Sequence, residues 1–197
     1  MVRQDSIIWD EFKRGNEEAF SRIYHQYFQI LYQYGFRFTQ NQELIEDAVQ
    51  DLFADLFKNR LTIGATDNIK LFLLKSFRRK LLRHLKKESR YTEESGSEIN
   101  FGIHLSPEDN LILGESEQLK WIRFNRALER LSHRQREAVY LRFKKELDYD
   151  EVAAIMEMSV EACRNLIYRA VKSIRQMLEE ESLSAAMLFI YGILKKD

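Results

Sequence analysis

The sequence predicts an all-α protein made of two small helical domains joined by a flexible acidic linker, with a helix-turn-helix in the second. Glycine and proline are scarce, with seven and one among 197 residues, so few points interrupt a helix. Apolar residues make up 45% of the chain and recur at spacings of three and four, the pattern of helices with one buried face. The length is sufficient for one domain or two small ones with packed cores.

The first predicted domain, residues 6–90, opens with a pair of helices whose expected N-caps are Ser6 and Asn16. The second of these helices has a wide aromatic stripe at helical spacing. The stripe consists of Phe20, Ile23, Tyr24, Tyr27, Phe28, Leu31 and Tyr34. A stripe of this size predicts a buried helix face that contributes much of the first core.

A third helix starts at Asn41 and combines an apolar face with an acidic one. The predicted buried residues are Ile45, Ala48, Val49, Leu52, Phe53, Leu56 and Phe57. The opposite face carries Glu43, Glu46, Asp47, Asp51 and Asp55. Spacing alone leaves open whether this acidic face is simply solvated or, together with Gln50 and a partly exposed Phe53, docks a basic partner helix.

A polar loop at residues 60–68, with Gly64 as the helix breaker and Asp67 as the expected cap, leads into a strongly basic helix over residues 68–90. Its leucines 71, 74, 81, 82 and 85 are expected to anchor it. Its nine cations are Lys70, Lys75, Arg78, Arg79, Lys80, Arg83, Lys86, Lys87 and Arg90. With Phe72 and Phe77 nearby, this helix predicts binding to single-stranded or duplex nucleic acid. The alternative is a basic face that balances the acidic linker.

Residues 91–118 contain several carboxylates and no Lys or Arg, which predicts the flexible acidic linker. Helical periodicity is expected to resume near Leu119. Residues 179–197 form an apolar C-terminal extension. Its uncharged run over residues 183–194 is shorter than the roughly 20 residues needed to span a bilayer. We expect a terminal helix that docks on the second domain, with a surface for a partner or a second copy as the alternative.

The second domain, residues 119–178, contains the helix-turn-helix pattern, which begins with a capping box at Ser132 and Gln135. A small helix and a tight turn then precede a final helix. The predicted buried stripe of this helix is Val160, Cys163, Ile167, Ala170, Ile174 and Met177. Its opposite face carries Arg164, Asn165, Tyr168, Arg169, Lys172 and Arg175. Cations, an amide and a phenol on one exposed face are suited to a DNA groove.

The residue types argue against an enzyme. The four histidines are scattered without metal-ligand spacing, and neither a phosphate-binding glycine loop nor a nucleophile motif is present, so no catalytic residue, metal or cofactor is expected. The single cysteine, Cys163, excludes a disulfide framework and is expected to be a core residue rather than a redox switch. The start of the chain lacks a signal-peptide pattern, which predicts a cytoplasmic protein.

Taken in order, these motifs resemble the extracytoplasmic-function (ECF) group of the sigma-70 family of bacterial RNA polymerase. Residues 46–53 are similar to the polymerase-binding helix, and residues 72–87 to the element that opens promoter DNA. Residues 131–137, 151–153 and 159–170 resemble the second sigma domain. No other sigma region lies between the two, which indicates the ECF group.

The resemblance implies a factor that binds core RNA polymerase, recognises promoter DNA and promotes transcription initiation. It makes residues 6–90 a sigma-2-like domain and residues 119–178 a sigma-4-like domain. The implied core-polymerase contacts are Glu46, Asp47, Gln50, Asp51, Phe53 and Asp55. The implied minus-ten contacts are Thr66, Asn68, Lys75, Arg78, Arg79, Arg83, Lys86 and Lys87. The implied minus-thirty-five contacts are Ser159, Glu161, Ala162, Arg164, Asn165, Tyr168, Arg169 and Lys172.

The resemblance also implies that the linker lies in the polymerase channel later taken by RNA, and that an anti-sigma factor can be a further partner, without membrane insertion. The formal net charge of zero, unusual for a free DNA binder, fits a factor whose DNA affinity comes mostly from polymerase.

The chain departs from the family pattern at several positions. Arg79 stands where Asn is usual, Ala162 and Cys163 replace a Thr-Val pair, and Glu157 stands where the tight turn commonly has Gly. A non-glycine residue at that turn is strained if the backbone needs a positive φ. Two alternative interpretations remain: a stand-alone helix-turn-helix regulator, and a protein-interaction module that has lost DNA binding.

Overall fold

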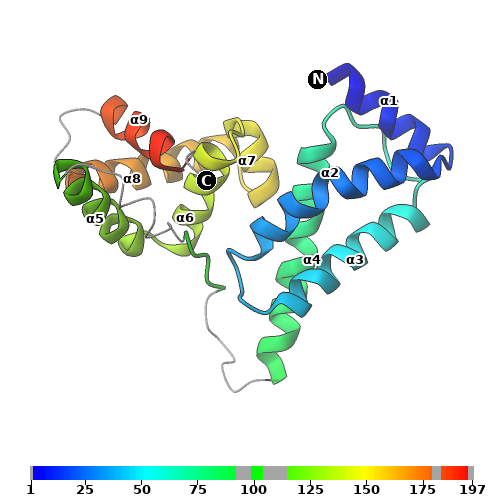
Figure 1. Cartoon of the computed structure of the whole chain (residues 1–197), viewed down its shortest axis with the longest axis horizontal. Coiled ribbons are helices and arrows are strands. Elements are labelled where there is room, and N and C mark those ends of the chain that lie inside the picture. The colour runs from blue at the N-terminus through cyan, green and yellow to red at the C-terminus, as the bar shows by residue number, and fades with distance from the viewer. Residues whose placement is uncertain (1, 92–98, 104–114, 179–182, 195–197) are drawn as a thin grey trace. The chain divides into compact units, whose positions relative to one another are not determined.

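The structure is a computed structural model that describes residues 2–91, 99–103, 115–178 and 183–194, and every regular element in these ranges is helical (Figure 1). The chain divides into two compact units, Met1–Asn100 and Phe101–Asp197, each described here by itself. The helical elements confirm the predicted all-α class, and the second unit contains the predicted helix-turn-helix.

The first unit consists of α1 (Val2–Lys13), α2 (Glu17–Gly35), α3 (Gln42–Lys58) and α4 (Ile69–Tyr91). α4 packs along α3, and α2 contacts α1, α3 and α4 (Figure 1). The core between them is rich in aromatic residues. Its largest fully buried side chains are Trp9, Phe12, Ile23, Leu31, Tyr34, Ile45, Ile69, Leu73 and Phe77.

Two of the predicted helix caps are confirmed. The side chain of Asn16 accepts the backbone N–H of Ala19 at 3.0 Å, and that of Asn41 accepts the N–H of Leu44 at 3.2 Å. Each amide oxygen satisfies one of the backbone N–H groups left unpaired in the first turn of a helix.

The other two predicted caps are wrong. Ser6 lies inside α1, because that helix already begins at Val2. Asp67 does not cap α4; Asn68, the residue directly before Ile69, does so, and its Oδ1 accepts the N–H of Leu71 at 2.9 Å. Ser, Asp and Asn are all residue types that cap helices, so the residue type alone does not identify the cap. The position at which each helix begins decides which residue caps it.

The predicted buried stripes are confirmed at their centres and fail at their edges. Ile45, Ala48 and Val49 are fully buried, as expected. Phe57, expected in the core, is 41% exposed, because it lies in the last turn of α3. Phe77, expected among the exposed cations of α4, is fully buried against the end of α2.

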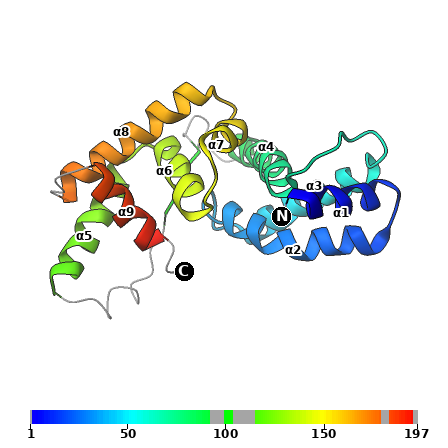
Figure 2. The ribbon, with the colours of Figure 1, turned by 90° about the horizontal axis from the view of Figure 1, so that it is seen from above.

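The second unit consists of α5 (Glu115–Arg130), α6 (His133–Val139), the π-helical turn η2 (Tyr140–Lys144), α7 (Tyr149–Met156), α8 (Val160–Leu178) and α9 (Leu183–Leu194). α5 begins earlier than the expected resumption near Leu119. Figure 2 shows α8 as a long helix that follows α7 after a tight turn, with α9 beside it.

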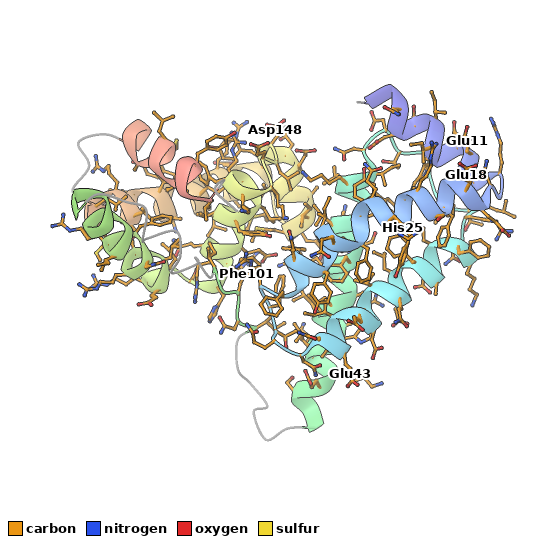
Figure 3. All side chains as sticks on the ribbon, viewed as in Figure 1. Glu11, Glu18, His25, Glu43, Phe101 and Asp148 are labelled. Atoms are coloured by element: carbon orange, nitrogen blue, oxygen red, sulfur yellow. The ribbon has the colours of Figure 1, made fainter. Side chains whose placement is uncertain are left out.

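Part of the predicted linker is anchored. Phe101 is fully buried in the second unit, where its ring lies 5.6 Å from that of Tyr140 (Figure 3). Its backbone N–H donates to Nδ1 of His133 at 3.2 Å. Residues 92–98 and 104–114 of the predicted linker lie outside the described residues.

Two capping boxes order the second unit. The predicted one is confirmed: Ser132 Oγ accepts the N–H of Gln135 at 3.3 Å, and the Ser132 N–H donates to the Gln135 side chain at 3.0 Å. The sequence analysis missed the second, in which the Asp148 N–H donates to the Glu151 carboxylate at 2.8 Å at the start of α7. Reciprocal capping of this kind fixes where a helix begins.

The apolar extension forms α9, which packs against α8 and η2 and confirms the expected docked terminal helix. Ala186, Ile190 and Leu194 are buried, and the Tyr191 hydroxyl donates to the Glu146 carboxylate at 2.6 Å. Among the described residues, no helix has both the length and the apolar character required to cross a membrane.

The turn between α7 and α8 depends on a left-handed residue. Glu157 has φ 54° and ψ 54°, and its N–H donates to Ala153 O to end α7. Residues other than glycine rarely adopt this backbone conformation, because their Cβ comes too close to the following carbonyl oxygen. The strain expected for a non-glycine residue at this turn is therefore present.

Gly35→Ala is expected to destabilise the first unit. A Cβ there would lie 2.8 Å from Ile45 Cγ2 and 3.0 Å from Phe77 Cζ, both in the core. Overpacking should exceed the gain in helix propensity and lower the free energy of unfolding by about 1–2 kcal/mol in urea titrations followed by circular dichroism. Gly64→Ala is the control, since no atom lies within 4 Å of its added Cβ. Equal stability of the two variants would contradict this packing.

Glu157→Gly is expected to stabilise the second unit by about 0.5–1 kcal/mol, because glycine adopts the left-handed conformation without a Cβ clash. Thermal unfolding of the full chain measures the change. Glu157→Ala separates the backbone effect from the loss of the carboxylate, since alanine keeps the Cβ. A gain of the same size in the alanine variant would show that the backbone conformation is not the cause.

Candidate nucleic-acid and protein interfaces

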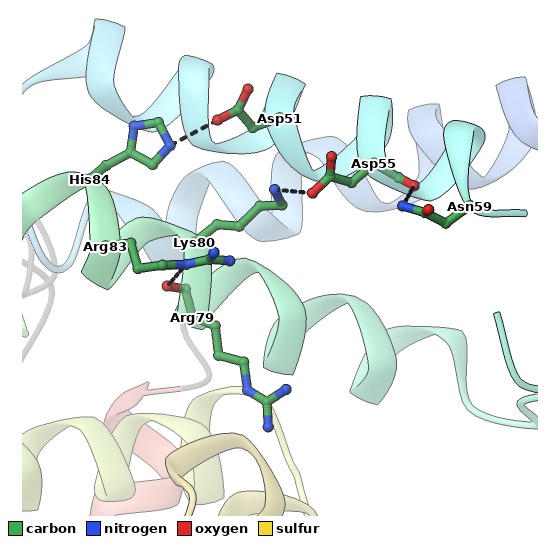
Figure 4. Close-up of polar contacts among 7 residues, drawn as sticks. All are labelled: Asp51, Asp55, Asn59, Arg79, Lys80, Arg83 and His84. Carbon is green, nitrogen blue, oxygen red and sulfur yellow. Dashed lines mark hydrogen bonds and ion pairs between the residues drawn. The ribbon is translucent and has the colours of Figure 1, made fainter. Parts of the chain in front are cut away.

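The acidic helix α3 and the basic helix α4 are joined by an ion pair and a histidine–carboxylate contact on the sides where they face each other. Lys80 Nζ lies 2.6 Å from Asp55 Oδ2, and His84 Nε2 lies 3.0 Å from Asp51 Oδ2 (Figure 4). The pKa of the Asp55 carboxyl lies below its ordinary value, mainly because Lys80 donates a hydrogen bond to it and also because other cations lie nearby. Asp51 and Asp55 therefore have partners within the unit, although their side chains stay 58% and 61% exposed.

The other polar residues of the candidate docking set on α3, Glu46, Asp47 and Gln50, are exposed. The candidate docking set therefore divides into these three residues and the pair Asp51 and Asp55 that faces α4. Helical periodicity alone placed Glu46, Asp47, Asp51 and Asp55 on one polar face, with Gln50 beside them.

The expected exposure of Phe53 is wrong. Its side chain is 3% exposed, because its ring packs 4.8 Å from Tyr24 and 6.0 Å from Phe20. Phe57 is the accessible ring instead, and it lies 5.3 Å from Phe20. Phe53 can therefore shape a docking surface, but it offers little area to a partner.

These rings form an aromatic groove between α2 and α3, with a volume of about 420 Å³. It is lined by Phe20, Tyr24, Gln50, Phe53, Ala54 and Phe57. Exposed apolar surface beside acidic residues is suited to an amphipathic helix with basic flanks. The spacing of positions 50, 54 and 57 is a signal that could have revealed the groove from the sequence.

The loop before α4 is held in place by α1, a contact that sequence reasoning missed. Trp9 Nε1 donates to the Gly64 carbonyl at 2.9 Å, and the Asp5 carboxylate accepts the Ile69 N–H at 3.1 Å. Trp9 is fully buried, with its ring 5.0 Å from Phe72. The first helix therefore fixes the shape of the loop and the start of the basic helix.

Thr66 and Asn68, two candidate DNA contacts, also build this loop. Thr66 Oγ1 accepts the Asn68 N–H at 3.2 Å, while Asn68 caps α4 through Leu71. Both side chains are half-buried. Their positions are therefore set before any ligand arrives.

The cations of α4 point in more than one direction. Lys80 and His84 point toward α3, whereas Arg79 points away from it (Figure 4). Arg79, Arg83, Lys86 and Lys87 are exposed, while Lys75 and Arg78 are half-buried. The exposed four form a continuous basic path at spacings of three to four residues, suited to a phosphate backbone.

Helix α8 separates its apolar stripe from a polar face, as predicted. Cys163, Ile167, Ala170 and Ile174 are buried, whereas Val160 and Met177 are half-buried at the ends. The exposed candidate contacts are Glu161, Ala162, Arg164, Asn165, Tyr168, Arg169 and Lys172. The hydroxyl of Ser159 accepts the Ala162 N–H at 3.2 Å and so caps the helix.

The described residues contain no cluster of three or more His, Cys, Asp or Glu side chains that could hold a metal ion. Burial raises the pKa of the Cys163 thiol, so at neutral pH the residue stays a protonated core side chain.

Two family models match the chain in order. The model of sigma-70 region 2 matches residues 23–91, and the model of sigma-70 region 4 matches residues 122–174. The first match contains α3, the loop and α4, and the second contains the helix-turn-helix.

Curated relatives extend the match over most of the chain. The ECF RNA polymerase sigma factor BldN of Streptomyces coelicolor is 28% identical over 171 residues, which cover 85% of this chain and 63% of BldN. The chain therefore aligns with less than two thirds of BldN. RNA polymerase sigma factor SigV of Bacillus subtilis is 26% identical over 156 residues, covering 79% of this chain and 89% of SigV.

Solved structures share the fold. CnrH, in complex with the cytosolic domain of CnrY, has a TM-score of 0.58 at 19% identity, covering 90% of this chain and 99% of CnrH. RpoE of Bartonella quintana, in complex with the anti-sigma factor NepR, has a TM-score of 0.59 at 20% identity, covering 84% and 99%. With both region models in their family order and sigma-factor relatives over most of its length, the chain belongs to the ECF group of the sigma-70 family.

Proposed function

We propose that this chain binds core RNA polymerase, recognises two promoter elements and promotes transcription initiation, without chemistry of its own. The observation that carries the proposal is the pairing of a region 2 unit, with an acidic and a basic helix side by side, and a region 4 unit with a polar recognition helix. Each unit supplies one DNA-binding surface, and only the first supplies an acidic docking helix.

The aromatic groove and the adjoining side of α3 are the proposed docking site for core polymerase. Glu46, Asp47 and Gln50 attract the basic side of a polymerase helix, while its apolar side chains enter the groove beside Phe57. Asp51 and Asp55 contribute less to this contact, because α4 already pairs them. Phe53 supports the groove from beneath.

The loop and α4 are the proposed minus-ten site. Arg79, Arg83, Lys86 and Lys87 follow the backbone of the separated strand, with Lys75 and Arg78 beside them. Thr66 and Asn68 shape the loop that receives an unstacked base. Unstacking costs a few kcal/mol per base, which these contacts offset.

The exposed face of α8 is the proposed minus-thirty-five site. Arg164, Asn165 and Tyr168 lie in its first turns, where a recognition helix contacts base edges. Arg169 and Lys172, further along, are placed for phosphates. At the N-terminus Ser159 caps the helix, beside Glu161 and Ala162, and the helix dipole favours a phosphate there.

Regulation and location follow from the same proposal. The chain would work in the cytoplasm, where polymerase and promoters are found. The predicted linker 91–118 begins with the last residue of α4 and ends with the first four of α5, and the part between these helices is proposed to lie in the polymerase channel that RNA later takes. An anti-sigma factor is a proposed further partner, since RpoE of Bartonella quintana was solved with one.

Run-off transcription with core polymerase on a promoter library tests the proposal. We expect promoter-specific transcripts only when the chain is added. Tight operator binding without polymerase would instead indicate a stand-alone regulator, and neither activity would indicate an interaction module.

In a binding titration of the full chain with core polymerase, Asp47→Lys is expected to weaken the affinity at least severalfold, since like charges would oppose a basic partner. Asp10→Lys, the same change on the exposed side of α1, is the matched control and should bind core polymerase normally. Core affinity unchanged by Asp47→Lys would contradict the docking surface assigned to α3.

A further inference from the structure

Tyr149 lies within cation–π range of two arginines from two other elements. Its ring centroid is 5.0 Å from Cζ of Arg142 in η2 and 5.7 Å from Cζ of Arg164 in the first turns of α8. Guanidinium groups are attracted to an aromatic ring at separations up to about 6 Å. The ring therefore connects η2, α7 and α8 at the start of the recognition helix.

The ring is itself held from two sides. Arg142 is fixed because its guanidinium donates to the Leu147 carbonyl at 2.9 Å and lies 3.9 Å from the Asp148 carboxylate. Tyr149 is the first residue of α7, directly after Asp148 (Figure 3), whose capping box with Glu151 sets the helix start. A fixed backbone and a fixed cation leave the phenol ring little freedom.

In contrast to the Tyr149 ring, the Arg164 side chain is not fixed by its own helix. It is exposed on α8, so without a neighbour its long side chain would sample many rotamers. A guanidinium held near a ring by a cation–π contact keeps N–H donors that point away from the ring, available for a bidentate contact to guanine. This contact thus favours some rotamers of Arg164 before DNA binds.

From this geometry we propose that Tyr149 is a positioning residue that orients Arg164 for reading the minus-thirty-five element. Tyr149 makes no base contact in this account; it acts through Arg164, with Arg142 holding the ring from η2. The proposal rests on the proposed function, because it requires Arg164 to read promoter DNA.

The test measures promoter discrimination by holoenzyme assembled from core polymerase and the full chain. Transcription is compared on an active promoter, on versions substituted at single minus-thirty-five base pairs, and on one substituted in the minus-ten element. Tyr149→Leu is expected to lower discrimination by about two- to fivefold, the strength of an exposed cation–π contact. The loss is expected at the same base pairs that Arg164→Ala affects. Tyr149→Phe keeps the ring and should retain discrimination, and minus-ten discrimination should not change in any variant.

A double-variant cycle separates positioning from a structural role. Tyr149→Leu should add nothing to discrimination in the Arg164→Ala background, because its effect passes through that side chain. A uniform loss on all promoters with discrimination intact would overturn the proposal. Independent, multiplying losses in the double variant would overturn it as well.

The outcomes also separate this inference from the proposed function. If Arg164→Ala lowers discrimination and Tyr149→Leu does not, only the positioning role fails. If Arg164→Ala leaves discrimination unchanged, the proposed readout fails and the positioning role with it. Should Tyr149→Leu prevent folding, Arg142→Met releases the ring from η2, and it is expected to lower discrimination at the same base pairs by a smaller factor; no change there would overturn the proposal.

Discussion

The packing of α4 against α3 is the interaction on which the first unit depends. It buries Leu73, Leu74 and Phe77 of α4 in a core shared with Ile45. The end of α2 packs closely against both helices because Gly35 has no Cβ to meet Ile45 of α3 and Phe77 of α4. The Lys80–Asp55 ion pair at the helix contact then neutralises one charge of each helix, while other acidic side chains of α3 and basic side chains of α4 remain exposed. One helix pair thus presents surfaces of opposite charge, which explains how a chain with no net charge can bind both protein and nucleic acid.

In the second unit, a single helix combines a buried apolar face with an exposed polar face. The buried stripe of α8 anchors it against α5, α6 and α7, which leaves its polar face exposed. The left-handed turn at Glu157 sets the direction in which α8 leaves α7. Its strain is tolerated because the surrounding packing determines the turn. Tyr149 then adds order to a side chain that the backbone alone would leave mobile.

Sequence patterns predicted the helices, most of the buried stripes and the exposed face of α8, because these depend on local periodicity. They failed for Phe57 and Phe77, since a helical stripe does not show which ring a neighbouring helix covers. The hydrogen bond from Trp9 to Gly64 joins residues 55 positions apart and has no local signature. The pairing of Asp51 and Asp55 with α4 was likewise hidden, because it depends on how two helices align. The family resemblance proposed the candidate sites, whereas the structure separated the exposed candidate residues from those that are buried or paired within their own unit.

Polymerase is proposed to deliver this chain to promoters, so that the free chain does not recognise promoter DNA efficiently. Fluorescence anisotropy with labelled promoter and scrambled DNA measures this directly for the chain alone, core polymerase alone and the two together, at one salt concentration. The account predicts a preference for promoter DNA only when both proteins are present. An equal preference and affinity shown by the free chain would contradict it.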